Sequence, residues 1–129
     1  MNPVVHFEMP YEDQGRMVEF YSKTFGWKPN ILGPEMGNYV VVETGERDEV
    51  TKMPKKPGMI NGGLYQKTGD NPFPSVVIAV DDIAEAMKNI EMAGGKIIGH
   101  PVDIPGTGTY VSFTDTEGNR ASIIKPLPM

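Results

Sequence analysis

Cysteine is absent from this sequence of 129 residues, which excludes disulfides, thiolate nucleophiles and zinc–sulfur sites. Long apolar segments are also missing, because no stretch approaches the roughly 20 apolar residues that a membrane-spanning helix requires. Residues 1–4 lack the basic start and apolar core of a signal peptide. We therefore expect a cytoplasmic protein, although the lack of cysteine would suit the periplasm equally well.

Positive charge is scarce relative to negative charge. Lysine and arginine number 12 against 17 aspartate and glutamate residues, so the net charge is 12 − 17 = −5. A nucleic-acid backbone or an anionic membrane would be repelled on average, and we expect neither as a partner. A chain of this length forms one domain that buries roughly 65–70% of its unfolded surface.

The sequence contains an internal repeat. Residues 38–44 reappear loosely as residues 109–115, an offset of 109 − 38 = 71. The strand-like residues 4–9 and 75–80 fit the same offset, since 75 − 4 = 71. A duplicated unit of this kind creates a cleft between its copies, and such clefts are typical of small-molecule sites.

Each copy is predicted to contain a strand, a helix and three further short strands. The first copy spans about residues 1–70 and the second about residues 71–129, within one domain. This order places the chain in the α+β class. After the initial strands at residues 4–9 and 75–80, the other strands are expected at residues 28–32, 38–44, 62–67, 96–101, 109–114 and 120–125.

Two amphipathic helices are predicted. The first, at residues 14–24, is closed by Gly26 and has one apolar stripe at spacings of three and four residues. The second begins after Asp82, whose carboxylate is expected to accept a hydrogen bond from the first turn, and ends at Gly94. The stripe of the first helix consists of Met17, Phe20, Tyr21 and Thr24.

The first strand alternates between two faces and is expected to stop at Pro10. His6 and Glu8 share one face, which we expect to point into the cleft. They are the candidate catalytic residues, a general base and the carboxylate that orients it. A structural hydrogen-bonded pair is the alternative. The face expected to pack under the helix consists of Val5, Phe7 and Met9.

Three short motifs stand out along this plan: Phe20-Tyr21-x-x-x-Phe25-Gly26-Trp27, Ala93-Gly94-Gly95-Lys96 and Asp115-Thr116-Glu117-Gly118-Asn119. Their order and spacing resemble the glyoxalase/bleomycin-resistance/extradiol dioxygenase superfamily, also called vicinal oxygen chelate proteins. The resemblance covers nearly the whole chain. It implies two tandem βαβββ modules that form a curved mixed sheet, an open half-barrel, around the cleft. It also implies a homodimer, since members commonly pair.

Enzymes of this superfamily usually hold a divalent metal with His, Gln or Glu side chains from four strands. The family's His would fall near Ser75 and its Glu near Ser122, and residues 62–67 contain no acidic or imidazole side chain. Only the first strand offers a ligand, His6, although the offset of 71 matches Ser75 with Val4. One ligand from four positions does not make a metal site, so we expect no metal and no other cofactor.

Two tyrosines occupy equivalent positions in the copies. Tyr39 and Tyr110 would present two hydroxyls and two ring faces to a ligand, or they fill ordinary strand positions, where tyrosine is favoured. The proline-broken loop at residues 46–60 is expected to close over the entrance of the cleft.

The function expected from these features is the metal-free binding of a small organic molecule in the cleft, as in binding or resistance proteins of the superfamily. The alternative is a metal-dependent lyase, isomerase or dioxygenase of the glyoxalase type, with ligands recruited away from the usual positions. The sequence leaves open whether a reaction is catalysed. The expected ligand-binding residues are His6, Glu8, Tyr39, Ser75, Val77, Tyr110, Ser112 and Ser122.

Overall fold

The computed structural model describes residues 1–50 and 55–127. The chain divides into two compact units. The N-terminal unit is His6–Pro74, and the C-terminal unit is Ser75–Met129 together with Met1–Val5. Within the described ranges, no helix has the length and apolar character needed to cross a membrane.

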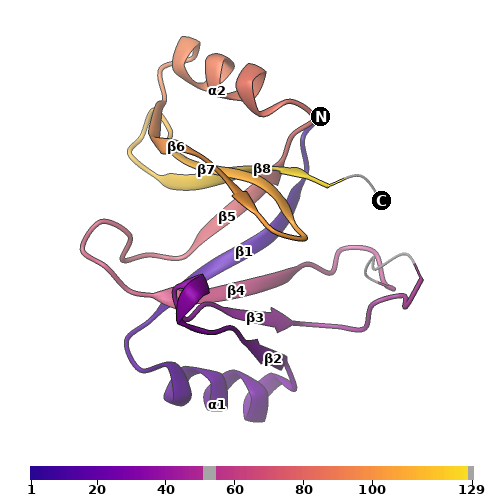
Figure 1. Cartoon of the computed structure of the whole chain (residues 1–129). Helices are drawn as coiled ribbons and strands as arrows, with labels where there is room; N and C mark the ends of the chain where they lie inside the picture. The colour runs from indigo at the N-terminus through magenta and orange to yellow at the C-terminus, as the bar shows by residue number, and fades with distance from the viewer. Residues whose placement is uncertain (51–54, 128–129) are drawn as a thin grey trace. The chain divides into compact units, whose positions relative to one another are not determined.

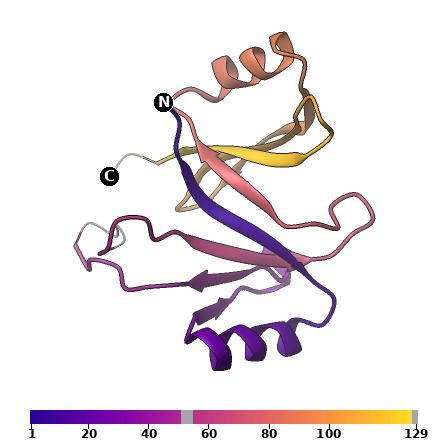
Figure 2. The ribbon, with the colours of Figure 1, turned by 180° about the vertical axis from the view of Figure 1, so that it is seen from behind.

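The N-terminal unit has a strand, a helix and then three strands (Figure 1). Its strand order is β2-β3-β4-β1, with β1 parallel to β4 and the other pairs antiparallel. Figure 2 shows β1 and β4 side by side from behind. The elements are β1 (Val4–Tyr11), whose first two residues belong to the C-terminal unit, α1 (Gln14–Phe25), β2 (Lys28–Ile31), the 3-10 helix η1 (Pro34–Met36), β3 (Val40–Glu43) and β4 (Asn61–Gln66).

The C-terminal unit repeats the chain order of one strand, one helix and three strands. Its strands lie in the order β5-β8-β7-β6, with β5 parallel to β8 and the other pairs antiparallel. The predicted α+β class and the two βαβββ modules are therefore confirmed. The elements are β5 (Ser75–Ala79), α2 (Ile83–Met92), β6 (Lys96–Ile104), β7 (Gly108–Thr114) and β8 (Arg120–Pro126).

Both helices begin at an aspartate whose side chain accepts a hydrogen bond from the first turn. Asp82 Oδ1 accepts from the Glu85 amide at 2.9 Å, as predicted, and Asp13 Oδ1 accepts from the Arg16 amide at 3.0 Å. At the other end of α1, Gly26 has the left-handed conformation, φ 73°, that closes a helix without steric cost. The sequence therefore predicted these helix limits to within one residue.

Each unit has its own apolar core, between its sheet and its helix. In the N-terminal unit, the buried residues Tyr11, Val40, Val42 and Leu64 pack with Phe7, Met9, Met17, Val18 and Trp27. In the C-terminal unit, Val80, Val111 and Ile123 pack with Ile78, Ile83, Ala86, Met87, Ile90, Ile97 and Phe113.

Two details of the predicted packing in the first module are wrong. Phe20 is 55% exposed, and Thr24 is exposed too, because the buried side of α1 runs through Met17, Val18 and Tyr21. Val5 is 39% exposed and does not join Phe7 and Met9 in the core.

Pro10 does not end β1, which continues to Tyr11. In a parallel strand pair, the backbone N–H and C=O of every second residue point toward the same neighbouring strand. Those of Tyr11 point toward β4, because the Tyr11 carbonyl accepts a hydrogen bond from the Lys67 amide at 2.9 Å. The backbone nitrogen of Pro10 therefore faces away from β4, so the lack of an N–H at this residue costs no hydrogen bond to β4.

The two modules correspond strand by strand, with different offsets. One rung of the N-terminal sheet consists of Glu8, Gly63 and Val41. The corresponding rung of the C-terminal sheet consists of Val77, Ser122 and Ser112.

The helix caps fix which residues correspond, because Asp13 and Asp82 are 82 − 13 = 69 residues apart. The strands that precede these caps, β1 and β5, share the offset of 69, since Glu8 and Val77 are 77 − 8 = 69 residues apart. By contrast, β3 and β7 keep the offset of 112 − 41 = 71. His6 therefore corresponds to Ser75, and the match of Ser75 with Val4 is wrong. A slip of two residues keeps every side chain on its face, so the alternation of the sequence cannot detect it.

Candidate functional site

The site residues predicted in the first module lie on one face of the sheet of the N-terminal unit. We call this the helix-free face, because it is the side of the sheet opposite α1. Phe7 and Met9 point toward α1 and its core, as predicted. His6 and Glu8 alternate with them along β1 and so occupy the other face. Tyr39 immediately precedes β3 and reaches the same face.

A hydroxyl links the two residues of the candidate pair. Tyr39 Oη lies 3.0 Å from His6 Nε2 and donates to Glu8 Oε2 at 3.0 Å. Glu8 is 9% exposed, which is unusual for a carboxylate unless it is hydrogen-bonded. His6, Tyr39 and Glu8 therefore form one hydrogen-bonded triad. Its existence supports the pairing of His6 with Glu8 and leaves their chemical role to be tested.

Backbone contacts hold Tyr39 in place. The preceding residue, Asn38, has φ 57°, an uncommon conformation for a residue other than glycine. Its carbonyl accepts hydrogen bonds from Tyr11 Oη at 2.8 Å and from Gln14 Nε2 at 2.9 Å. The Tyr39 carbonyl accepts from the Leu32 amide at 2.9 Å. The loop between η1 and β3 is thus fixed on both sides of the tyrosine.

Gly63 completes the site, although it was not among the residues predicted from the sequence. A Cβ atom at Gly63 would overlap Oη and Cζ of Tyr39, so only glycine lets the phenol lie against β4. Gly63 is also the register partner of Glu8. Gly62 plays the same part on the other face, where a Cβ would overlap the ring of Phe7. The Gly-Gly pair inside a strand was the available signal, because glycine there often marks a close approach.

The electrostatics of the site centre on His6. Burial lowers the pKa of His6, the carboxylate of Glu8 raises it, and the positive charge of Arg47 lowers it, with burial the largest effect. Arg47 lies in the loop after β3, and its Nε is buried 3.7 Å from Glu43 Oε1, beyond hydrogen-bond distance. Arg47 was not predicted as part of the site, since nothing in a charged loop indicates which cation will face the sheet.

The residues predicted for the second module lie on the helix-free face of the C-terminal unit. Ser122 Oγ donates to Tyr110 Oη at 2.7 Å, and Ser112 Oγ lies 2.9 Å from Ser122 Oγ. Ser112 and Ser122 are buried. Val77 is the register partner of Ser122, and Ser75 begins the same strand as Val77. This surface is small and polar, with no carboxylate or imidazole among these five residues.

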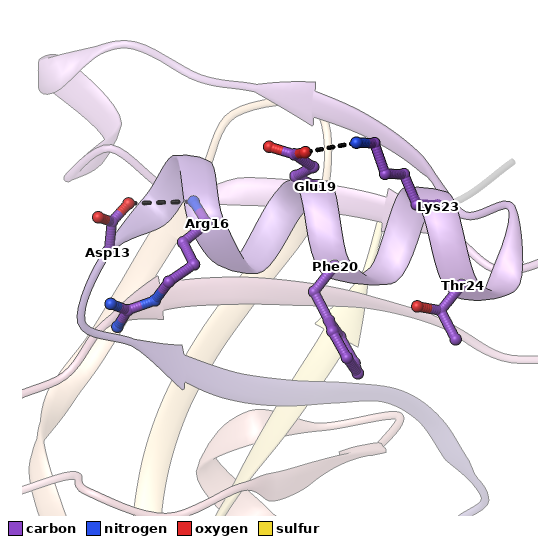
Figure 3. A pocket seen from close by; sticks show the side chains of 6 residues that line it. All are labelled: Asp13, Arg16, Glu19, Phe20, Lys23 and Thr24. Atoms are coloured by element: carbon purple, nitrogen blue, oxygen red, sulfur yellow. Dashed lines mark hydrogen bonds and ion pairs between the residues drawn. The ribbon is translucent and has the colours of Figure 1, made fainter.

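An open hollow of about 570 Å³ lies along the outer side of α1 (Figure 3). Its lining alternates in charge around the exposed ring of Phe20, and Glu19 pairs with Lys23 at 2.6 Å. None of the predicted site residues lines it. The lining residues are Asp13, Arg16, Glu19, Phe20, Lys23 and Thr24.

The side chains at the positions implied by the family resemblance do not fit a metal. His6 corresponds to Ser75, and Gly63 corresponds to Ser122, so the four positions supply one imidazole and no carboxylate. Two serine hydroxyls and a glycine are poor ligands for the divalent ions that His and Glu bind. Across residues 1–50 and 55–127, no group of three or more His, Asp or Glu side chains is arranged to hold a metal.

Comparisons with known proteins place this arrangement in a family. Residues 4–123 match the Glyoxalase/Bleomycin resistance protein/Dioxygenase superfamily. "Putative glyoxylase CFP32" of Mycobacterium bovis is 32% identical over 111 residues, 84% of this chain and 38% of that protein. The anthracycline biosynthesis protein DnrV of Streptomyces peucetius is 26% identical over 123 residues, 87% of this chain and 42% of that protein. The chain thus spans about two fifths of the length of these curated relatives.

Other similar proteins have nearly the same length. A glyoxylase-like domain-containing protein of Didymella fabae is 30% identical over 121 residues, 90% of this chain and 88% of that protein. Among solved structures, a Streptomyces coelicolor methylmalonyl-CoA epimerase has a TM-score of 0.70 at 13% identity, covering 100% of this chain and 97% of that one. At that identity the structure supports the fold alone. The chain belongs to the Glyoxalase/Bleomycin resistance protein/Dioxygenase superfamily.

Proposed function

We propose that this chain is a glyoxalase-like protein that binds a small, partly apolar organic molecule without a resident metal. The observation that carries the proposal is the triad on the helix-free face of the N-terminal unit, where Tyr39 Oη contacts both His6 and Glu8. A few convergent polar groups on a mostly apolar surface are typical of small-molecule sites. Val41 and Gly63 of the same face supply the apolar part.

The second module is proposed to supply a further binding surface. Its helix-free face offers hydroxyls and small apolar groups, which suit contact with uncharged ligand groups. Without an acid or a base, this surface would serve recognition and not proton transfer. The residues proposed to bind a ligand on this face are Ser75, Val77, Tyr110, Ser112 and Ser122.

The relatives support a role in small-molecule chemistry. Their names include a glyoxylase and a protein of anthracycline biosynthesis. Because one fold hosts many activities, the ligand of this chain has to be found by experiment. The predicted closure of residues 46–60 over the ligand depends in part on residues 51–54, which lie outside the described residues.

A thermal-shift screen of metabolites and antibiotics tests the proposal. A ligand that binds only the native state raises the melting temperature, because it stabilises the fold by RT ln(1 + [L]/Kd), where [L] is the free ligand concentration. We expect a hit to lose affinity at least about tenfold in Tyr39→Phe and in His6→Gln, the loss of a charge-assisted or well-placed hydrogen bond. The matched controls are Tyr21→Phe, whose hydroxyl contacts Met9 Sδ on the helix side, and His100→Gln, an exposed site. Unchanged affinity in both test variants would contradict the proposal.

We also propose that the protein forms a homodimer. The edge strand β2 is exposed at all four residues, and sheet edges favour pairing or covering by another chain. Light scattering at micromolar concentrations should give a mass near 2 × 14.2 = 28.4 kDa. A mass near 14.2 kDa throughout that range would show a monomer.

A further inference from the structure

The outer side of α1 exposes an aromatic ring among charged side chains. Phe20 is 55% exposed, and its neighbour Phe25, whose ring centroid lies 6.4 Å away, is 61% exposed. The ring of Phe20 lines the open hollow, and the charged side chains beside it come from α1 and its N-cap (Figure 3). Exposed apolar surface inside a polar rim marks places that another protein covers. This side of α1 is therefore a candidate interface.

The charges on this side of α1 alternate in sign along the helix. From the N-terminal end they are Asp13, Arg16, Glu19 and Lys23, at spacings of three or four residues that place them on one side of a helix. All four are exposed, and their charges cancel in a chain whose net charge is −5. A second copy of the chain therefore meets a locally neutral surface here, without the repulsion that its net charge causes elsewhere.

Reversal of the helix direction converts this pattern into its opposite. Asp13 and Lys23 each lie five residues from position 18, on opposite sides of it. Arg16 lies two residues before that position, and Glu19 and Phe20 lie one and two residues after it. Two such helices that lie antiparallel about a two-fold axis at this level place Asp13 of each copy opposite Lys23 of the other. Arg16 of each copy then lies opposite Glu19 and Phe20 of the other.

A parallel arrangement would place equal charges opposite each other. When the two-fold axis runs along the helices, each residue meets its own equivalent, so that Asp13 would face Asp13 and Arg16 would face Arg16. Like charges that face each other across an interface are unfavourable. The charge pattern therefore selects the antiparallel arrangement, and it is complementary to a second copy of itself, as a two-fold interface requires.

We propose that two copies of the chain pair through the outer sides of their α1 helices, which lie antiparallel about a two-fold axis near position 18. Phe20 supplies the apolar contact at the centre, where its ring meets the guanidinium of Arg16 from the other copy. The charged pairs around it stay close to solvent, so they determine the alignment more than the affinity. Because α1 contacts β2, the interface borders the exposed edge strand. This inference rests on the proposed homodimer and names its surface.

Single cysteines test the alignment, because the chain contains none of its own. In the antiparallel arrangement, Glu19→Cys places the two thiols about two residues apart along the helices, roughly 3 Å. Lys23→Cys places them about ten residues apart, roughly 15 Å, which no disulfide spans. Under mild oxidation, Glu19→Cys should therefore form the linked dimer at least about tenfold faster than Lys23→Cys. Equal rates, or a faster reaction at position 23, would contradict the antiparallel alignment.

Charge reversal tests the pairing of Arg16 with Glu19. Arg16→Glu and Glu19→Arg should each raise the dissociation constant of the dimer about tenfold or more, because two-fold symmetry makes each substitution act twice. The double variant restores opposite charges and should recover most of the association. Lys88→Glu is the matched control, since it makes the same change of charge on an exposed site of α2. Sedimentation equilibrium measures the association, and circular dichroism confirms that each variant is folded. Weakening by both single substitutions without recovery in the double variant would contradict the pairing.

Phe20→Ala should weaken the dimer at least about tenfold, as the loss of a central aromatic contact does. Met92→Ala, at a site that is 76% exposed on α2, should leave it unchanged. A wild-type dimer that tolerates both Phe20→Ala and Arg16→Glu would overturn this surface and leave the homodimer to the β2 edge. A monomeric wild type would overturn this inference together with the homodimer. The thermal-shift screen decides the proposed ligand binding separately in either case.

Discussion

Tyr39 lies against the backbone of Gly63, and the absence of a side chain at position 63 is what allows the contact. The same glycine is the register partner of Glu8, which accepts the hydrogen bond of Tyr39. Two residues 63 − 39 = 24 apart in the sequence thus define one site. The contact explains why a residue of low strand propensity stands in the interior of β4.

Gly63→Ala should displace Tyr39 and destabilise the fold. Overpacking of this kind typically costs about 1–3 kcal/mol, measured by urea unfolding. Gly63→Ala should cost less stability in a protein that also carries Tyr39→Ala, because the ring that the new Cβ would overlap is then absent. Gly69→Ala is the matched control, since a Cβ there meets nothing within 4 Å. Equal costs in the presence and absence of the Tyr39 ring would contradict the packing argument.

The sequence indicated the faces of the strands well and the details of their register poorly. His6 and Glu8 were correctly separated from Phe7 and Met9, because alternation reports the face of each residue. The correspondence of Ser75 with His6 was missed, since a slip of two residues preserves alternation.

Side chains that depend on the tertiary structure were also missed. Arg47 reaches the vicinity of His6 from a loop, and no sequence pattern specifies that approach. Phe20 was assigned to the core because the spacing rule includes the residues that flank the buried side of a helix. Asp82 was predicted correctly because an N-cap depends only on residues within one turn.

Protonation of His6 should make the fold less stable as the pH falls. The pKa of His6 is lowered in the folded chain, so near its usual value of about 6.5 the unfolded chain takes up a proton first. Stability from this group is complete above about pH 6.5 and is lost below it, until the folded imidazole also protonates. The slope reaches at most about 1.4 kcal/mol per pH unit, the value for one proton.

Urea unfolding of the wild type and of His6→Gln at several pH values isolates this contribution, because the carboxylates titrate in both proteins. The stability difference between them should depend on pH below about 6.5. His100→Gln should follow the wild type, since His100 is exposed. A wild-type protein that gains stability relative to His6→Gln on acidification would show that the sign is wrong.

Ser122→Ala should destabilise the C-terminal unit. Ser122 Oγ bonds both Tyr110 Oη and Ser112 Oγ, and Ser112 is buried. Removal of the hydroxyl takes a partner from a buried polar group, which costs about 1–3 kcal/mol. Thr116→Ala is the control, because that hydroxyl bonds the neighbouring Glu117 at an exposed turn. A cost for Ser122→Ala no larger than that of the control, in denaturant titrations of both, would argue against the buried bonds.

Asp82→Ala should weaken the start of α2 by about 1 kcal/mol, the usual cost of losing an N-cap side chain. Asp82 Oδ1 accepts from the Glu85 amide, whereas the adjacent Asp81 is exposed and outside the cap. Asp81→Ala therefore removes the same charge without the hydrogen bond. Thermal melts of the two variants should differ. Equal melting temperatures would mean that charge, and not capping, determines the effect of Asp82.

Protein purified without chelator should retain no stoichiometric divalent metal. Of the four strand positions that the family resemblance implies, only His6 carries a metal-binding side chain, and Gly63, Ser75 and Ser122 do not. A single imidazole binds a divalent ion too weakly to survive dialysis. Elemental analysis after dialysis, and again after incubation with Ni²⁺, Mn²⁺ or Fe²⁺, is the measurement. One tightly held metal per chain, lost in His6→Gln, would favour the metal-dependent lyase, isomerase or dioxygenase instead, because His6 would then be a ligand and its nitrogen no longer available as a base.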